Sequence, residues 1–267
     1  MKIVRIDDPD DPRLAAYRDI RERDLRGREG LFIAEGKVVL NVLFAARRFA
    51  ADSVLILENR LEGMSETLAL APQQLPVYVA AAPVLDRIAG FHLHRGILAA
   101  GRRPQQPDLE EVLDALPAEA LVLVLVGIAN HDNMGALFRN AAAFGVDLVL
   151  LDSTSCDPLY RKAIRVSVGA ALKVPFAVAG SAAEIAASLA ARGFSNLALS
   201  PRGGEDIRTV RAGPRVALFM GTEGEGLPAA VMAAMRTARI RMAEGFDSLN
   251  VAAAAAIALH QLAALPR

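Results

Sequence analysis

The sequence predicts an α/β fold in which a parallel sheet is flanked by helices, preceded by a smaller α/β domain. Two observations support this prediction. After residue 120, apolar runs of strand length alternate with helical stretches, as in parallel sheets covered on both faces. Before that, residues 101–120 form a polar stretch with prolines, which is typical of a linker. We therefore divide the chain into a first domain (1–103), a linker (104–119) and a second domain (120–267).

The first domain combines a helical pattern with short strands. Residues 20–49 begin with an arginine-rich segment and continue with a helical pattern. Residues 53–57 (SVLIL) and 77–80 (VYVA) have the length and composition of strands. The residues at helical spacing are Leu40, Leu43, Phe44 and Arg47.

The second domain shows a regular alternation of strands and helices. The predicted strands are 121–127, 147–152, 196–200 and 216–221. The predicted helices between them are 134–145, 158–170 and 181–193. In such sheets ligands bind beyond the carboxyl ends of the strands, so the segments that follow the strands are the first place to look for a site.

Composition indicates an ordinary globular protein without a membrane span. Of the 267 residues, 53% are hydrophobic and 22% are charged. The longest nearly apolar run, 251–265, is shorter than the ~20 residues needed to cross a bilayer. The N-terminus lacks the apolar core of a signal peptide, and a single cysteine, Cys156, excludes an internal disulfide. We expect a cytoplasmic protein.

The charge balance is neutral, with 30 basic and 30 acidic residues. This argues against a protein that coats nucleic acid non-specifically, but it leaves room for a local basic patch. Arginine greatly outnumbers lysine. Arginine suits bidentate phosphate contacts, although a coding bias toward Arg and Ala explains the same imbalance.

Three segments that follow predicted strands are candidates for chemistry. In NHDNMGALFRNAAAFG (130–145), Asn133 precedes a helix of small residues and Arg139 follows six positions later. Asn133 as a simple helix cap and Arg139 as a solvated charge remain an alternative. In IRMAEGFDSLN (240–250), a short strand leads through Asp247, Ser248 and Asn250 into an alanine-rich helix, and each of these three residues is also a possible cap.

The remaining segment, GTEGEGLP (221–228), is a glycine-rich turn that does not suit phosphate. Its glycine order is neither a dinucleotide fingerprint nor a Walker loop, and the carboxylates of Glu223 and Glu225 repel anions. A tight turn that uses glycine for its backbone freedom is the alternative. The four histidines and Cys156 show no zinc spacing, and Ser200 and Ser248 lack the context of a hydrolase nucleophile, so no metal is expected.

Together the three segments resemble the SpoU (TrmH-type) RNA 2′-O-ribose methyltransferases of the SPOUT superfamily. The family's first motif, N-x-G-A-x-x-R-x-A-x-x-F-G, is matched from Asn133 to Gly145. Its second resembles FMGTEGEGL and its third I-x-M…SLNVA, in the right order across residues 120 to 265. The stretch 156–170 is also similar to the family, through Arg165, Ser167, Gly169 and Ala170.

The first half is similar to the substrate-binding domain that precedes many family catalytic domains. The similarity rests on residues 32–44 and 91–101. It implies an RNA-binding role, with Arg21, Arg23, Arg26 and Arg28 as candidate phosphate contacts. Their acidic neighbours leave open that this segment is a solvated charged helix.

The resemblance implies S-adenosylmethionine as the cofactor, a neutral nucleoside that carries a cationic sulfur and no phosphate. The implied cofactor contacts are Leu199, Gly221, Ile240 and Leu249. The implied catalytic residues are Asn133, Arg139, Glu223, Ser248 and Asn250. Because a guanidinium is hardly ever deprotonated, we interpret Arg139 as a cation that stabilises the developing alkoxide or holds an adjacent phosphate.

The resemblance also implies a C-terminal trefoil knot and a homodimer with active sites at the subunit interface. The expected substrate is structured RNA, with ribosomal RNA slightly favoured over transfer RNA. Alternatives are a base methyltransferase of the same superfamily, an RNA-binding or ribosome-assembly protein without catalysis, and a nucleotide-dependent oxidoreductase. The intact polar residues argue against lost catalysis, and the missing dinucleotide fingerprint argues against the oxidoreductase.

Overall fold

The computed structural model describes residues 2–18, 20, 30–222 and 224–263, which form two compact units. Unit 1 contains Met1–Gln105 together with Pro158–Lys173, and unit 2 contains Gln106–Asp157 with Val174–Arg267. This division differs from the predicted one in two respects. The predicted linker, 104–119, is divided between the two units after Gln105. The segment Pro158–Lys173, expected inside the second domain, packs with the first.

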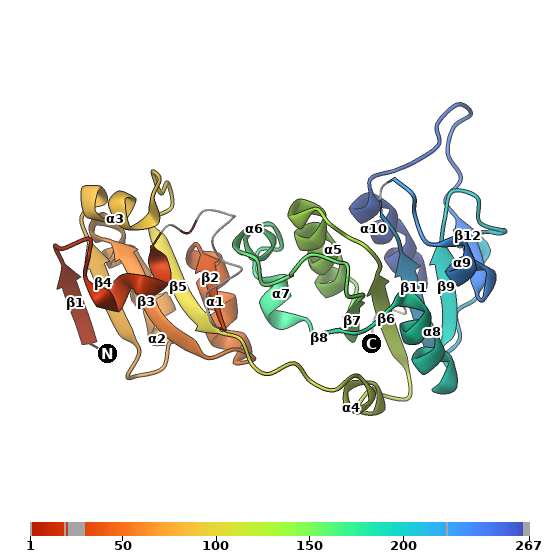
Figure 1. Ribbon diagram of the computed structural model, residues 1–267, viewed down its shortest axis with the longest axis horizontal. Helices are drawn as coiled ribbons and strands as arrows, with labels where there is room; N and C mark the ends of the chain where they lie inside the picture. The colour runs from red at the N-terminus through yellow and green to blue at the C-terminus, as the bar shows by residue number, and fades with distance from the viewer. Residues whose placement is uncertain (1, 19, 21–29, 223, 264–267) are drawn as a thin grey trace. The chain divides into compact units, whose positions relative to one another are not determined.

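Unit 1 is built on a five-stranded mixed sheet in the order β1-β4-β3-β5-β2 (Figure 1). The strands are β1 (Lys2–Ile6), β2 (Leu31–Glu35), β3 (Ala51–Leu57), β4 (Pro76–Ala80) and β5 (Ile97–Arg102). β1, β4 and β3 are parallel, and β5 runs antiparallel to β3 and β2. The helices are α1 (Lys37–Ala46), α2 (Ser65–Ala69), α3 (Ala82–Ala89), α6 (Arg161–Val166) and α7 (Ala170–Lys173).

The core of unit 1 includes one buried polar network. The Tyr17 hydroxyl lies 2.8 Å from the Ser53 hydroxyl and accepts a hydrogen bond from the Ala100 backbone N–H at 3.1 Å. Burial raises the pKa of Tyr17, so the phenol stays neutral. Tyr17 therefore ties the short helix Pro12–Tyr17 to β3 and β5.

The segment from Pro158 to Lys173 is held in unit 1 by a buried ion pair and a close backbone contact. Arg161 Nη1 donates to Glu35 Oε2 at 2.5 Å, and both side chains are almost fully buried. Gly169 has a positive φ of 86°, and a Cβ there would lie 3.0 Å from Val42 Cβ on α1. Glycine thus permits α7 to approach α1 closely.

Unit 2 is built on a seven-stranded parallel sheet in the order β10-β12-β9-β11-β6-β7-β8. This confirms the predicted α/β fold with its parallel sheet. The strands are β6 (Ala120–Leu125), β7 (Leu148–Leu151), β8 (Phe176–Val178), β9 (Ser195–Leu199), β10 (Glu205–Asp206), β11 (Arg215–Met220) and β12 (Arg236–Arg239). The expected strand at 240–242 is wrong, because β12 ends at Arg239 and Ile240 already lies beyond it.

Helices cover both faces of this sheet. α4 (Leu109–Asp114), α8 (Ala182–Ala191) and α9 (Ala229–Ala233) contribute to a core with alternate residues of the central strands, such as Val122 and Val124. α5 (His131–Ala143) and α10 (Val251–Leu262) lie side by side (Figure 1). The predicted linker is therefore not structureless, because it contains α4, which Asp108 caps and whose Leu113 is buried in the core.

Two expectations about the chain as a whole have different outcomes. Within the described residues, no helix has the length and hydropathy of a membrane span. The trefoil knot implied by the resemblance stays a prediction.

Candidate functional site

Three of the four predicted cofactor contacts lie at the carboxyl ends of neighbouring strands. Leu199 ends β9, Gly221 follows β11 and Ile240 follows β12. β9 pairs with both other strands, and Leu199 is in register with Ala238. The three positions are thus spread across two strand spacings, about 10 Å. This is the edge at which parallel α/β sheets bind ligands.

The turn at Gly221 folds back on its own backbone. A Cβ at this position would lie 2.3 Å from the backbone carbon of Gly226 and 2.4 Å from the Leu227 nitrogen. Only glycine permits so close an approach. Such a turn leaves backbone amides and carbonyls near the sheet edge, the groups needed to recognise an adenine. The apolar Leu199 and Ile240 lie at the ends of the next two strands on one side of it, β9 and β12. These residues fit a nucleoside cofactor.

The first and third sequence motifs meet through two asparagines. Asn250 Nδ2 donates to Asn133 Oδ1 at 3.0 Å, although the residues are 117 positions apart. Asn250 also caps α10, since its Oδ1 accepts from the N–H groups of Ala252 and Ala253 at 2.9 and 3.3 Å. A further bond, from Asn140 Nδ2 to the Ala252 carbonyl at 2.7 Å, joins the same two helices.

Asn133 is not the cap of α5. Asn130 has that role, because its side chain accepts from the N–H groups of Asp132 and Asn133 at 2.7 and 3.3 Å. Asn133 lies inside the first turn, with its side chain directed to α10. Its contact with Asn250 removes the alternative in which Asn133 serves as a simple helix cap.

The other predicted catalytic residues are exposed or outside the described residues. Arg139 is exposed on α5, and in the described part of the chain its guanidinium makes no hydrogen bond or ion pair. Ser248 Oγ donates to Asp247 Oδ1 at 3.3 Å on the exposed segment before α10, where Leu249 is also exposed. Glu223 lies outside the described residues, as do Arg21, Arg23, Arg26 and Arg28.

A pocket on the other side of the Gly221 turn was not predicted. It has a volume of about 380 Å³ and is lined by the loops after β6, β7, β8 and β11, including Thr222 and Gly226. None of the four predicted cofactor contacts lines it. Two carboxylates line it, those of Asp152 and Glu225, and Asp152 is already engaged by protein donors.

Asp152 holds the loops after β6 and β7 together. Its Oδ1 accepts from the Gly127 N–H at 2.9 Å and from the Ser155 hydroxyl at 2.7 Å, and its Oδ2 accepts from the Thr154 hydroxyl at 2.5 Å. The sequence signal for this role is an aspartate directly after a buried strand, followed by three hydroxyl residues, 153–155. Among the described residues no group of three metal-ligating side chains could hold a metal ion.

The fold and this geometry define a class of protein: an α/β protein whose parallel sheet has a tight glycine turn at its carboxyl edge and whose helices α5 and α10 are joined by two asparagines. Comparisons with known proteins define it further. Residues 120–260 match the model of the SpoU rRNA Methylase family. The chain belongs to this family of S-adenosylmethionine-dependent RNA methyltransferases.

Relatives cover most of the chain. It is 41% identical over 264 residues to an uncharacterised tRNA/rRNA methyltransferase of Mycobacterium bovis, covering 95% of this chain and 89% of that protein. It is 33% identical over 187 residues to the 23S rRNA (guanosine-2′-O-)-methyltransferase RlmB of Bordetella pertussis, covering 69% of this chain and 76% of the relative. Both proteins support the expected class of enzyme.

Solved structures share the fold along nearly the whole length. An RNA 2′-O ribose methyltransferase superposes with a TM-score of 0.79 at 27% identity, covering 98% of each chain. An AdoMet-bound rRNA methyltransferase from Sinorhizobium meliloti superposes with a TM-score of 0.80 at 23% identity, covering 97% of each chain. The second likeness shows the fold alone.

Proposed function

We propose that this protein transfers the methyl group of S-adenosylmethionine to a ribose 2′-hydroxyl of structured RNA, with ribosomal RNA favoured over transfer RNA. The main support for this proposal is the hydrogen bond between Asn133 and Asn250, which joins two motifs 117 residues apart. The similarity to RlmB, a 23S rRNA (guanosine-2′-O-)-methyltransferase, and to the RNA 2′-O ribose methyltransferase supports the choice of the 2′-oxygen and of ribosomal RNA.

In this proposal the cofactor is held by the carboxyl edge of the sheet. The backbone around Gly221 and Ile240 would contact the adenosine, Leu199 would line its apolar side, and Leu249 in the segment before α10 would be a further contact. When bound, the cofactor supplies an electrophilic methyl group on a cationic sulfur. Glu225 near such a cation is tolerated, whereas it would repel a phosphate.

The protein's own residues position the ribose and stabilise charge. With the cofactor bound, these residues would hold the 2′-hydroxyl at the methyl group and stabilise its oxygen as the proton is lost. Arg139 stays protonated and stabilises the developing negative charge on the oxygen. Asn133 and Asn250, fixed to each other, orient the ribose, with Glu223 and Ser248 as further hydrogen-bonding groups.

Three broader features belong to the same proposal. Unit 1 binds RNA, with the arginines at 21, 23, 26 and 28 as candidate contacts. The active protein is a cytoplasmic homodimer in which exposed residues of α10, such as Ile257, pack against the partner. The C-terminal segment forms the trefoil knot that the family resemblance implies.

The test is a methyl-transfer assay on separated RNA fractions. The protein is incubated with methyl-labelled S-adenosylmethionine and unmodified ribosomal or transfer RNA, and the digested nucleosides are resolved. Label in a 2′-O-methylnucleoside from ribosomal RNA is the expected result. Label on a base would make the protein a base methyltransferase. Cofactor binding without any transfer would favour an RNA-binding protein without catalysis.

A further inference from the structure

Four arginines lie around the carboxyl ends of β9, β10 and β12. Asp206 in β10 is in register with Arg239 in β12, so Arg208 and Arg241 both follow the ends of their strands. The turn after β9 lies at the same ends, because the Ser200 N–H donates to the Ala238 carbonyl. We call this set the edge arginines: Arg202, Arg208, Arg239 and Arg241.

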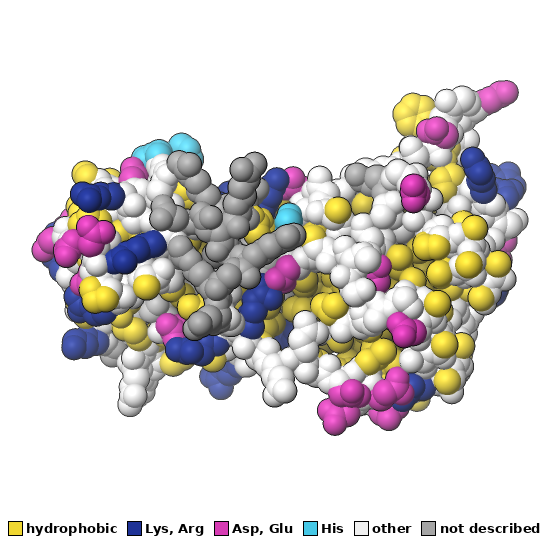
Figure 2. All heavy atoms as spheres, viewed as in Figure 1, with side chains coloured by type: hydrophobic (Ala, Val, Ile, Leu, Met, Phe, Trp, Pro, Cys, Tyr) yellow, Lys and Arg dark blue, Asp and Glu magenta, His cyan; other side chains and the backbone are white. Residues whose placement is uncertain are grey.

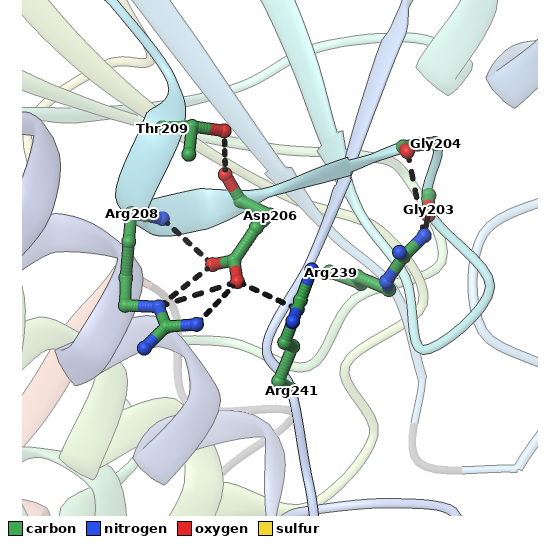
Figure 3. Close-up of polar contacts among 7 residues, drawn as sticks. All are labelled: Gly203, Gly204, Asp206, Arg208, Thr209, Arg239 and Arg241. Carbon is green, nitrogen blue, oxygen red and sulfur yellow. Dashed lines mark hydrogen bonds and ion pairs between the residues drawn. The ribbon is translucent and has the colours of Figure 1, made fainter.

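Two of the edge arginines are fixed by one carboxylate (Figure 3). Arg208 donates to Asp206 through Nη2 at 2.7 Å and through Nε at 3.1 and 3.2 Å to the two oxygens. Arg241 Nε lies 3.0 Å from Asp206 Oδ2. The Asp206 side chain is 7% exposed, while those of Arg208 and Arg241 are 69% and 66% exposed. The carboxylate thus holds two guanidiniums whose outer faces meet solvent.

The carboxylate stays charged under all ordinary conditions. Hydrogen bonds from the Arg208 side chain and backbone lower the pKa of Asp206 to about 2. The arrangement of Arg208 and Arg241 is therefore independent of pH across the neutral range.

The edge arginines carry a net positive charge. Arg239 Nη1 donates to the carbonyls of Gly203 and Gly204 at 2.6 and 3.3 Å and has no carboxylate partner in the described residues. The exposed Arg202 side chain likewise makes no ion pair there. Four guanidiniums against one carboxylate leave an excess of three positive charges in a chain whose net charge is zero.

The unused donors of this cluster face outward. Within the described residues, Arg208 Nη1 and both Nη atoms of Arg241 have no hydrogen-bond partner. Figure 2 shows dark blue side chains beside the base of the projecting segment 241–249. A pair of guanidiniums held by a buried carboxylate is arranged before it meets a ligand, so less side-chain entropy is lost on binding an anion with several oxygens.

The cluster lies close to the proposed cofactor edge. Arg241 directly follows Ile240, and β10 is two strand spacings, about 10 Å, from β9. An RNA whose ribose reaches this edge must carry its phosphates past the neighbouring surface. A cluster that only anchored the 240–249 segment would need Arg241 alone, and would leave Arg202 and the outer face of Arg208 without a role.

We propose that the edge arginines bind the phosphate backbone of the RNA substrate next to the methyl-transfer site. This inference rests on the proposed function. It places an RNA-binding surface on unit 2, in addition to the surface proposed for unit 1.

The test measures RNA affinity as a function of salt for Arg208→Gln/Arg241→Gln, with deproteinised 23S ribosomal RNA as the probe. Loss of two solvent-exposed ionic contacts weakens binding about tenfold at low salt. It also reduces the slope of log K against log salt by about 2. Arg236→Gln is the matched control, since Arg236 pairs with Glu205 at the opposite end of β12 and should leave both quantities unchanged.

A second variant tests the surface without disturbing the contacts of Asp206. Arg202→Gln removes an exposed side chain that makes no hydrogen bond in the described residues, and it should reduce the salt slope by about 1. Calorimetric affinity for S-adenosylmethionine should remain at the wild-type value in every variant. Equal loss of cofactor affinity in the double variant would make the cluster an anchor for segment 240–249 and overturn the proposal.

The remaining outcomes separate this inference from the proposed function. If the wild-type protein binds and methylates RNA but all variants bind it with unchanged affinity and slope, the surface is wrong and the function stands. If the wild-type protein neither binds nor methylates RNA, the function itself fails and the inference fails with it.

Discussion

At the scale of single residues, Asn250 combines two roles that different substitutions can separate. Its Oδ1 caps α10 and its Nδ2 donates to Asn133. An aspartate keeps the capping oxygen and loses the donor, whereas an alanine loses both. Comparing the two substitutions therefore separates the effect of the helix cap on stability from the effect of the Asn133 contact on activity.

We predict that Asn250→Asp keeps the stability of the protein but lowers methyl transfer, whereas Asn250→Ala lowers both. The alanine should reduce the free energy of unfolding by about 1 kcal/mol, the usual value of an N-cap. Chemical denaturation and initial rates of transfer measure the two effects. Asn130→Ala is the control, because it removes the α5 cap without touching α10. Full activity of Asn250→Asp would contradict a role for the asparagine contact.

Arg139 has no partner among the described residues, so its removal should cost little stability. We predict that Arg139→Ala abolishes methyl transfer to RNA while leaving calorimetric affinity for S-adenosylmethionine nearly intact, because the residue acts on the ribose oxygen. Arg139→Lys keeps the charge and should retain partial activity if electrostatic stabilisation is its role. Parallel loss of cofactor binding and activity would remove Arg139 from the catalytic step.

Gly221 and Gly224 stand three residues apart in the same loop but differ in the space around them. A Cβ at Gly221 would meet the backbone of Gly226, whereas a Cβ at Gly224 would have nothing within 4 Å. We predict that Gly221→Val blocks cofactor binding and that Gly224→Val leaves it within about twofold, since a surface substitution changes free energies by roughly 0.5 kcal/mol. Wild-type affinity of Gly221→Val, measured by calorimetry, would contradict the placement of the cofactor.

At the scale of elements, β2 and α6 are joined by the buried pair of Glu35 and Arg161. We predict that Glu35→Gln lowers the free energy of unfolding by about 3 kcal/mol, because it leaves a buried guanidinium without its counter-charge. Glu58→Gln should cost less than about 1 kcal/mol, because the Arg5–Glu58 pair is exposed. Replacing both buried partners, as in Glu35→Leu/Arg161→Met, should recover most of the loss. A Glu35→Gln protein as stable as wild type would show that the pair is not required.

The long apolar elements were predictable, and the short polar ones were not. The strands β6, β7, β9 and β11 fall within a residue or two of their predicted ranges, because each is a continuous apolar run. β10 and β12 are short and carry charged residues, and they are strands because their neighbours offer an unpaired edge. The strand propensity of these residues alone does not show which neighbouring strand they pair with.

The sequence predicted a set of candidate residues but not the geometry that joins them. Motif order indicated Asn133 and Asn250, yet no local pattern shows that they bond to each other across 117 positions. The helix start illustrates the limit: both Asn130 and Asn133 are good caps, and only the structure shows that Asn130 has this role. No sequence pattern predicted the edge arginines, because they come from separate segments and only the register of the strands brings them together.

At the scale of the whole molecule, the sequence order of the two domains does not match their packing. The chain leaves unit 2 after Asp157, contributes α6 and α7 to unit 1, and returns at Val174. Apolar residues of this segment, including Ile164 and Leu172, are fully buried. A linker-based division at residue 120 misses this, because helical periodicity shows that a face is buried but not which partner buries it.

We therefore predict that a fragment of residues 106–267 is less stable and less soluble than the full chain. The fragment lacks β2 and α1, the elements that α6 and α7 contact, and each buried apolar side chain that becomes exposed costs about 1.5–3 kcal/mol. Thermal unfolding and light scattering of the fragment measure the effect. Ile164→Gln/Leu172→Gln supplies the matched test: it should improve the solubility of the fragment while destabilising the full-length protein. A fragment that unfolds as cooperatively and at the same temperature as the full chain would show instead that these helices belong with unit 2.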